Sequence, residues 1–259
     1  MLAKAQIRGS LSVRQTAGKV VDQPFLSVII PTWNEEDCVA SLLNHFEEIM
    51  PISNYEIIVS DGGSTDATIA TIRHYPQVRI VQARRGRARQ LNVGACYARG
   101  QWLYFLHADT LPPDDLWEQL CVAEKRQLES ACFSLRFDSQ HPLLRFCSWC
   151  SRLNWNCFRY GDQSLLVRRE VFHDCGGYRE ELEIMEDNEI VRRLNRRGHF
   201  QLLPAEVQTS ARKYRYYGPI YLQSVYTLVY FLNRWGLSQS RLLRLYRYLL
   251  PPPQGKARR

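Results

Sequence analysis

"LSVIIPTWNEEDCVASLLNHFEEIM" (residues 26–50) joins a short apolar strand directly to an amphipathic helix. The strand, residues 26–31, is apolar on both of its faces, which is typical of a parallel sheet covered on both sides. The helix, residues 36–50, carries apolar side chains at spacings of three and four residues, namely Val39, Leu42, Leu43, Phe46, Ile49 and Met50. This pairing predicts the first unit of an α/β fold.

The same alternation continues through the first half of the chain. We expect strands at residues 55–60, 78–82 and 102–106, and helices between them at residues 66–75 and 87–99. The order β-α-β-α-β-α-β predicts a mainly parallel sheet with helices on both faces. Ligands of such sheets bind beyond the carboxyl ends of the strands, so we expect the functional residues in the loops that follow them.

The second half has a different pattern. Residues 131–138 alternate strictly between apolar and polar, which predicts a half-exposed, antiparallel strand. Further strands are expected at residues 163–168 and 202–204. A helix is expected over residues 187–197, with Gly198 just past its end.

Two more helices are expected near the carboxyl terminus, at residues 219–235 and 238–250. We therefore divide the chain into a flexible lead-in (residues 1–24), a main α/β domain (25–213), C-terminal amphipathic helices (214–250) and a basic disordered tail (251–259). The last helix repeats an arginine every third residue between leucines, at Arg241, Arg244 and Arg247. Two alternatives stay open for it: contact with an anionic membrane surface, or packing on the domain with its arginines in water.

Composition narrows the choice of partners without deciding it. The chain has 259 residues, of which 45% are hydrophobic and 23% charged, and its formal net charge is +8. This basic balance suits nucleic acid, an anionic membrane surface or phosphorylated small molecules. The amino terminus has no apolar signal-peptide segment, so we expect a cytoplasmic protein with reduced cysteines, and the inner face of the membrane remains an alternative location.

Four loops after the predicted strands carry residues that suit a nucleotide and its phosphates. The first holds Pro31, Trp33 and Glu35, where an aromatic side chain and free backbone groups can enclose a base; a turn that leads into the helix is the alternative. The second begins with Asp61, whose carboxylate can accept hydrogen bonds from a base or a ribose hydroxyl. Backbone flexibility at the glycines that follow lets a ligand come close.

The third loop contains Gly86 and Arg87 within a run of arginines at a helix start. Arginines are unfavourable there unless an anion such as a diphosphate is present, and a solvated basic surface is the alternative. The fourth loop holds His107 and Asp109, which can bind Mg²⁺ or Mn²⁺. In the second half, Asp187 opens a helix, where a carboxylate either complements the helix dipole or acts as a general base.

These motifs occur in an order that is more specific than any one of them. "SVIIPTWNEE", "EIIVSDGGSTDAT", "GRARQLNVGA", "WLYFLHADT", "GDQSLLVRREVFHDCGGY" and "MEDNEIVRRLNRRG" together resemble the family 2 glycosyltransferases. The resemblance runs from about Leu26 to Lys213. It implies a GT-A fold, a three-layer α/β/α sandwich with a mixed, mainly parallel sheet, followed here by the C-terminal helices. The pattern "FLHADT", "YGDQ", "MEDNEIVRRL" and "TSARKY" is similar to the bacterial branch associated with arsenosugar biosynthesis.

The resemblance also implies roles for individual residues. Pro31 and Trp33 correspond to the loop that touches the base, and Asp61 to the carboxylate that binds it. Arg87 corresponds to a basic residue near the donor, after Gly86. Asp109 matches the last carboxylate of the family's DxD metal motif, and Asp187 matches the catalytic base. His107 departs from the pattern, because a carboxylate is expected at its position.

The sequence thus predicts an inverting transfer of a sugar from a UDP- or GDP-sugar to an acceptor hydroxyl, assisted by Mn²⁺ or Mg²⁺. The acceptor is unknown, and no nucleic-acid partner is expected. A nucleotidyltransferase is one alternative, but the 31–35 loop lacks the glycines that a phosphate loop needs. The other is a basic protein that binds RNA or membranes without catalysis, which would not need Asp61, Asp109 and Asp187 in one cleft.

Overall fold

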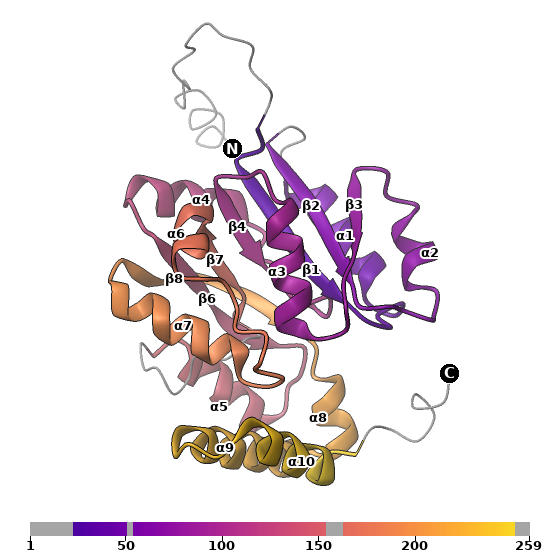
Figure 1. Ribbon diagram of the computed structural model, residues 1–259, viewed down its shortest axis with the longest axis vertical. Helices are drawn as coiled ribbons and strands as arrows, with labels where there is room; N and C mark the ends of the chain where they lie inside the picture. The colour runs from indigo at the N-terminus through magenta and orange to yellow at the C-terminus, as the bar shows by residue number, and fades with distance from the viewer. Residues whose placement is uncertain (1–22, 51–53, 154–162, 252–259) are drawn as a thin grey trace, which may run out of the picture.

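The computed structural model describes residues 23–50, 54–153 and 163–251. Within these residues an eight-stranded sheet has the order β3-β2-β1-β4-β7-β6-β8-β5 (Figure 1). Its strands are β1 (Leu26–Thr32), β2 (Tyr55–Asp61), β3 (Val78–Gln82), β4 (Trp102–Phe105), β5 (Thr110–Leu111), β6 (Ser130–Phe137), β7 (Leu165–Arg168) and β8 (Phe200–Thr209).

The first four strands are parallel, as their apolar sequences predict. β1 pairs with β2 on one side and with β4 on the other, and β2 pairs with β3. The side chains of β1, β2 and β4 are mostly buried because helices cover both faces, whereas the edge strand β3 leaves Arg79 and Gln82 exposed. The carboxyl ends of β1 and β2 lie level, with Thr32 opposite Asp61, so the loops that follow these two strands meet at one edge of the sheet.

Helices form a layer on each face of the sheet, which confirms the three-layer prediction. One apolar core joins the sheet to α1 (Val39–Ile49), α2 (Thr68–Ile72), α4 (Leu116–Lys125) and α5 (Pro142–Ser151). A second core joins the other face to α3 (Arg87–Tyr97), α6 (Arg169–Asp174) and α7 (Glu186–Arg197), which lie in front of the sheet in Figure 1. The helix of residues 187–197 is confirmed, and Gly198 follows it at φ 90°.

Two predictions for the second half of the sheet are wrong in detail. The strand expected at residues 131–138 is β6, which is antiparallel to β7 but parallel to β8, and it is not half-exposed, since Arg136 is the one exposed residue within β6. Small polar residues fill the side that the alternation suggested would face water. The strand expected at residues 202–204 is much longer. β8 continues through Pro204, which has no N–H to donate, because β8 bulges there, opposite Phe133 and Ser134, and proline is tolerated at a bulge.

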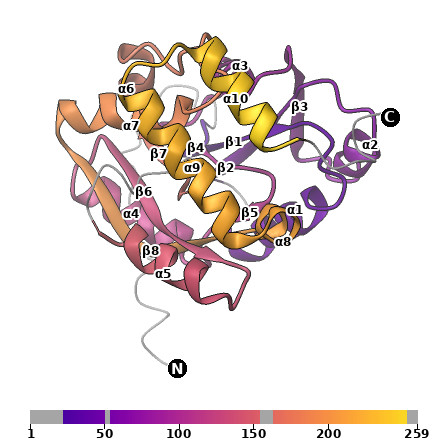
Figure 2. The same cartoon turned by 90° about the horizontal axis from the view of Figure 1, so that it is seen from below.

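The C-terminal helices cover the end of the molecule at which the parallel strands finish (Figures 1 and 2). They are α8 (Arg212–Tyr217), α9 (Pro219–Arg234) and α10 (Gln239–Leu249). Leu222, Val225 and Leu242 on α9 and α10 belong to the same apolar core as the sheet. Among the described residues, no helix is long and apolar enough to cross a membrane. The proposed lead-in and tail lie almost entirely outside the described residues.

Candidate functional site

The carboxyl end of β2 holds Asp61 in a closed hydrogen-bond cage. Its Oδ1 accepts from the Thr32 hydroxyl at 3.0 Å and from the Ser64 hydroxyl at 2.5 Å. Its Oδ2 accepts from the backbone N–H groups of Gly63 and Ser64, both at 2.9 Å. The carboxylate is therefore 3% exposed and shapes the 61–64 turn. A carboxylate fixed this rigidly can present only its remaining lone-pair directions to a ligand.

Trp33 lies on the loop after β1 and remains partly exposed. The guanidinium of Arg85 stacks over its ring, with Cζ 3.4 Å from the ring centroid. Asn34 holds this loop against the next one, because its backbone is left-handed (φ 56°) and its side chain accepts from Thr65 N at 2.8 Å. The two loops thus form one unit in which an arginine is stacked on one face of an aromatic ring. That is a suitable surface for a base next to a phosphate.

Gln90 on α3 is a site residue that the sequence did not single out. Its buried amide donates to Thr32 O at 2.7 Å and to Ser60 O at 2.9 Å, and its carbonyl accepts from Gly86 N at 3.3 Å. One side chain therefore connects the ends of β1 and β2 to the start of α3. The sequence carries no signal for this role, because the burial of Gln90 is visible only in the fold.

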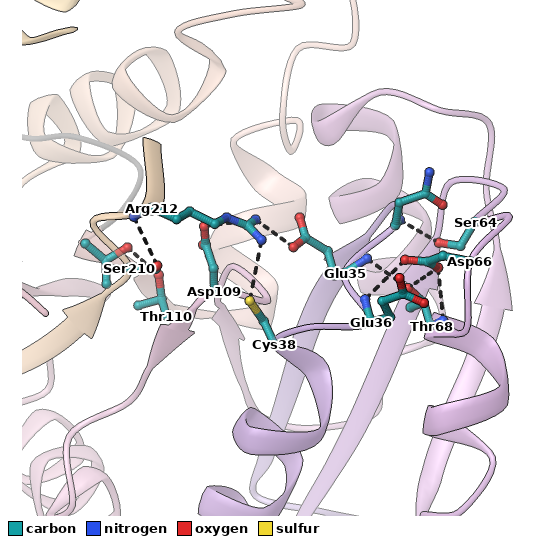
Figure 3. A network of polar contacts seen from close by, with 12 residues as sticks. Glu35, Glu36, Cys38, Ser64, Asp66, Thr68, Asp109, Thr110, Ser210 and Arg212 are labelled. Carbon is teal, nitrogen blue, oxygen red and sulfur yellow. Dashed lines mark hydrogen bonds and ion pairs between the residues drawn. The ribbon is translucent and has the colours of Figure 1, made fainter. Parts of the chain in front are cut away.

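Arg212, at the start of α8, bridges two of the predicted site carboxylates (Figure 3). Its Nη2 lies 2.7 Å from Glu35 Oε2 and 3.3 Å from Asp109 Oδ2. Its Nη1 approaches Cys38 Sγ at 3.5 Å. The three charged residues come from the loop after β1, the loop after β4 and the segment after β8. We refer to Glu35, Arg212 and Asp109 as the Arg212 bridge.

The pKa values of Glu35 and Arg212 depend both on burial and on the neighbouring charges of the Arg212 bridge. Burial raises the pKa of Glu35 above its ordinary value, the Arg212 cation opposes this rise, and the Asp109 carboxylate adds to it. For Arg212, burial alone would lower the pKa, but the two neighbouring carboxylates raise it. The bridge carries one positive and two negative groups when all three are ionised.

A second arginine bridge contains the predicted base. Arg87 Nη1 donates to Asp187 Oδ2 at 3.0 Å and lies 3.1 Å from Glu186 Oε1. The Glu186 contact is an ion pair without hydrogen-bond alignment, and this carboxylate is almost fully buried. His107 Nε2 lies 3.9 Å from the same Asp187 oxygen. The structure thus brings together the predicted donor residue Arg87, the predicted base Asp187 and His107.

The backbone around Asp187 explains its placement. Met185, the residue before α7, has a left-handed conformation (φ 65°), which is uncommon outside glycine and asparagine and often marks a functional segment. A small cavity bounded by Leu91, His107, Tyr178 and Asp187 lies beside it. Burial raises the pKa of Tyr178 well above its ordinary value, and the carboxylates of Asp187 and Glu186 add to this. The Tyr178 hydroxyl therefore stays neutral.

The predicted site residues fall into three neighbouring groups. Pro31, Trp33 and Asp61 lie at the ends of β1 and β2 and in the loop after β1. Glu35 and Asp109 share Arg212. Gly86 starts the helix that carries Arg87, and His107 lies close to Asp187. No group of three or more His, Cys, Asp or Glu side chains suitable for a metal ion occurs within the part of the chain that the structure describes. Asp109 and His107 contact different arginine bridges.

The chain belongs to glycosyl transferase family 2, whose family model matches residues 27–182. A relative from Methanococcus voltae, dolichyl N-acetyl-alpha-D-glucosaminyl phosphate 3-beta-D-2,3-diacetamido-2,3-dideoxy-beta-D-glucuronosyltransferase, is 33% identical over 99 residues, which are 35% of this chain and 31% of the relative. The chain thus spans about a third of the length of the curated relatives that it matches.

Two solved structures share the fold. The Pyrobaculum calidifontis mannosyltransferase PcManGT, in complex with GDP-Man and Mn²⁺, has a TM-score of 0.63 and 21% identity, covering 88% of this chain and 70% of that one. Residues 1–349 of S. aureus TarS, in complex with UDP-GlcNAc, give 0.61 and 16%, covering 86% and 71%. These likenesses confirm the predicted GT-A type of fold.

Proposed function

We propose that this chain transfers a sugar from a nucleotide-diphosphate-sugar to an acceptor hydroxyl with inversion at the anomeric carbon. The observation that carries the proposal is the 3.0 Å contact between Arg87 and Asp187 at the carboxyl edge of the parallel sheet. The contact joins Arg87, whose cation suits the donor diphosphate, to Asp187, whose carboxylate can take the acceptor proton. Membership of glycosyl transferase family 2 supports the reaction class.

Asp187 is the proposed general base. Its carboxylate is only 13% exposed, borders a cavity and is oriented by Arg87. In the proposed step it takes the proton from the acceptor hydroxyl while the oxygen attacks the anomeric carbon. The nucleoside diphosphate leaves from the opposite face of the sugar, and Arg87 stabilises the charge that develops on it.

Trp33 and Asp61 are proposed to receive the nucleoside. Trp33 offers a ring face beside Arg85, which places a cation close to where the phosphates would follow the base. Asp61 has a fixed orientation through Thr32 and Ser64, so it can accept a hydrogen bond from a base N–H without rearrangement. Pro31, Glu35 and Gly86 complete the proposed donor site. They border it and shape its loops.

Asp109 can supply one hard oxygen ligand to a divalent ion, but it cannot by itself supply a complete coordination shell. Its Oδ2 already faces Arg212, and a single carboxylate leaves most of the coordination shell to phosphate oxygens and water. We therefore propose that Mn²⁺ or Mg²⁺ binds as a complex with the donor and stabilises the leaving group's charge. His107 is a further candidate ligand, although it lies nearer to Asp187.

The donor's nucleotide, the acceptor and the cellular location are proposals at different levels of detail. The two fold neighbours are in complex with UDP-GlcNAc and with GDP-Man, which keeps both UDP- and GDP-sugars in the proposal. The Methanococcus relative's name includes a dolichyl-linked phosphate, so a lipid-linked acceptor is one choice. Association with arsenosugar biosynthesis and a cytoplasmic location stay predictions from the sequence.

A panel of UDP- and GDP-sugars tests the proposal. Each is added with Mn²⁺ or Mg²⁺, and unfolding is followed by thermal shift; a donor at about 100 times its Kd should stabilise the protein by about 2.7 kcal/mol. The donor found is then incubated with candidate acceptors. Release of nucleoside diphosphate supports glycosyl transfer, whereas release of pyrophosphate from a nucleoside triphosphate would support the nucleotidyltransferase alternative.

The Asp187→Asn variant tests the role of the base. Turnover should fall by roughly 10²–10⁴, because the amide cannot accept the proton. Donor binding in the thermal-shift assay should not weaken, because the amide carries no charge that competes with the diphosphate for Arg87. Near-normal turnover in this variant would remove Asp187 from the mechanism.

A further inference from the structure

A stripe of apolar side chains along α9 faces outward. Ile220, Leu228, Phe231 and Trp235 are between 45% and 79% exposed, and their spacing places them on one side of the helix. The opposite side of α9 packs on the protein through Leu222, Val225 and Val229. The helix therefore has apolar residues on two sides, of which only one is used by the fold.

The outward stripe borders an open groove of about 650 Å³. The groove is lined by Leu143 of α5, by the outward side of α9 and by Trp235, which follows the last residue of α9. α5 lies beside α9 (Figure 2) and adds two large exposed rings, Phe146 and Trp149, which stack on each other at 6.0 Å. We call the outward stripe together with Phe146 and Trp149 the α5–α9 surface. An exposed apolar surface of this kind marks an interaction site.

Charge is segregated along the sequence. Residues 207–259 contain ten of the 34 Lys and Arg residues and none of the 26 Asp and Glu residues. The rest of the chain therefore has 24 basic and 26 acidic residues, so the whole positive excess lies in the C-terminal segment. On α9 and α10, Arg234, Arg241, Arg244 and Arg247 are all exposed.

α10 supplies charge to this end but little apolar surface, since Tyr248, at 82%, is its one large hydrophobic side chain classed as exposed. Its buried Leu242 packs into the protein core, and the Tyr221 hydroxyl of α9 donates to Leu249 O at 2.9 Å. The arrangement in which α10 packs on the domain with exposed arginines is thus the one observed. The leucines of α10 are buried or half-buried, so the larger exposed apolar contact is the α5–α9 surface.

We propose that the α5–α9 surface docks on an anionic lipid bilayer, with the arginines of α9 and α10 at the headgroups. Trp, Phe and Tyr side chains suit the interface of a bilayer, and arginines beside them are attracted to anionic lipids. A second copy of the chain suits the surface less well. A two-fold contact would bring the same basic residues of both copies together.

Vesicle co-sedimentation tests the docking without any need for activity, so its failure is distinct from failure of the proposed function. The full chain is mixed with vesicles of phosphatidylcholine alone or of phosphatidylcholine with phosphatidylglycerol. We expect binding to the anionic vesicles that weakens with salt. Arg241→Gln with Arg244→Gln should lower partitioning roughly 25-fold, because each basic side chain near an anionic surface contributes about fivefold.

Phe231→Ser with Trp235→Ser should reduce binding by about tenfold or more, since these rings supply the apolar contact. Ile220→Ser with Leu228→Ser is an independent pair in case the first one perturbs folding, which a thermal melt reports. Matched controls are Tyr97→Ser on α3, which is 46% exposed, and the pair Arg196→Gln and Arg197→Gln at the end of α7. The controls should bind like the wild-type chain.

Four results would overturn the proposal. They are equal binding to neutral and anionic vesicles, no binding to either, unchanged binding by both serine pairs, and equal losses in the controls. Light scattering that finds a dimer broken by the Phe231 and Trp235 changes, without vesicle binding, would assign the surface to a second copy. Binding to poly(U) in place of vesicles, lost with Arg241 and Arg244, would assign it to nucleic acid.

Discussion

Replacing Arg212 with methionine removes the one cation of the Arg212 bridge while keeping an unbranched side chain of similar reach. Glu35 and Asp109 would then face each other's charge without their contacting cation, since Arg212 lies 2.7 Å from one and 3.3 Å from the other, and only the charge of Lys213 would still favour ionised Glu35. These carboxylates are 21% and 19% exposed, so water compensates only in part. We expect Arg212→Met to destabilise the fold measurably.

The size of the effect follows from the burial of the three groups. Removing one partner of a fully buried ion pair costs about 3–5 kcal/mol, whereas exposed pairs contribute about 0–1 kcal/mol. Arg212 is 32% exposed, which places the bridge between these cases, at about 2 kcal/mol. For a chain of this size that corresponds to a fall in Tm of roughly 4–8 °C.

The loss should also depend on pH. The pKa of Glu35 is raised in the fold by burial, so its ionisation destabilises the folded state as pH rises from about its ordinary value of 4.5 through the folded pKa. Arg212 opposes this rise, so the pKa of Glu35 should be higher still in Arg212→Met. The difference in stability between wild type and variant should therefore be largest at neutral pH and should shrink as pH falls.

Urea unfolding at pH 7.5 and pH 5, followed by circular dichroism, measures both the loss of stability and its dependence on pH. Arg215→Met is the matched control, because Arg215 has an exposed ion pair with Asp138 at 3.4 Å and should change stability by under about 1 kcal/mol. Adding Glu35→Gln to Arg212→Met should recover stability and flatten the pH dependence. A variant that unfolds like the control, or a loss equal at both pH values, would refute the reasoning.

Four other substitutions test the metal assignment and two structural contacts. Asp109→Ala should abolish the tightening of Mn²⁺ binding by UDP or GDP in calorimetry, whereas His107→Ala should weaken it only if the imidazole is a ligand; full coupling without Asp109 would remove the metal assignment. Gln90→Leu should cost about 2 kcal/mol in chemical unfolding, because buried backbone carbonyls lose their donor; an unchanged midpoint would contradict this. Gly177→Ala should lower Tm, since φ is +63° and the new Cβ would lie 2.9 Å from Asn92 Oδ1; a wild-type Tm would show that the turn adapts.

The parallel half of the fold could be predicted because local patterns determine it. Short, mainly apolar runs and helices with one apolar face were sufficient to place β1–β4 and α1–α3 within a few residues. The second half depends on contacts that local pattern does not contain. β8 continues through Pro204 only because the neighbouring strand accommodates a bulge, and the polar side of β6 is buried by its position inside the sheet.

The same distinction applies to the site. Asp61, Arg87 and Asp109 were identified because they follow strands, and the strand order brings those ends together. Arg212 was missed as a site residue because it lies 177 positions from Glu35, beyond the reach of any spacing rule. Gln90 was missed because a glutamine in a helix is ordinarily solvent-facing, and only the sheet edges above it make its amide necessary.

The two arginine bridges give the site a property that neither half of the chain has alone. Arg87 belongs to α3 and holds the start of α7, while Glu35 follows β1 and holds the start of α8 through Arg212. Each bridge has one cation for two carboxylates, so a diphosphate that approaches Arg87 competes with Asp187 for the same guanidinium. Under the proposed function, donor binding would therefore change the contacts of the base, and Asp187 would be released towards the acceptor only when a donor occupies the site.

This order of events requires donor affinity to rise when Asp187 is replaced by alanine, because the competing carboxylate is then absent. An Asp187→Ala variant that binds the donor more weakly than the wild-type chain would show that Arg87 does not link the two halves of the reaction.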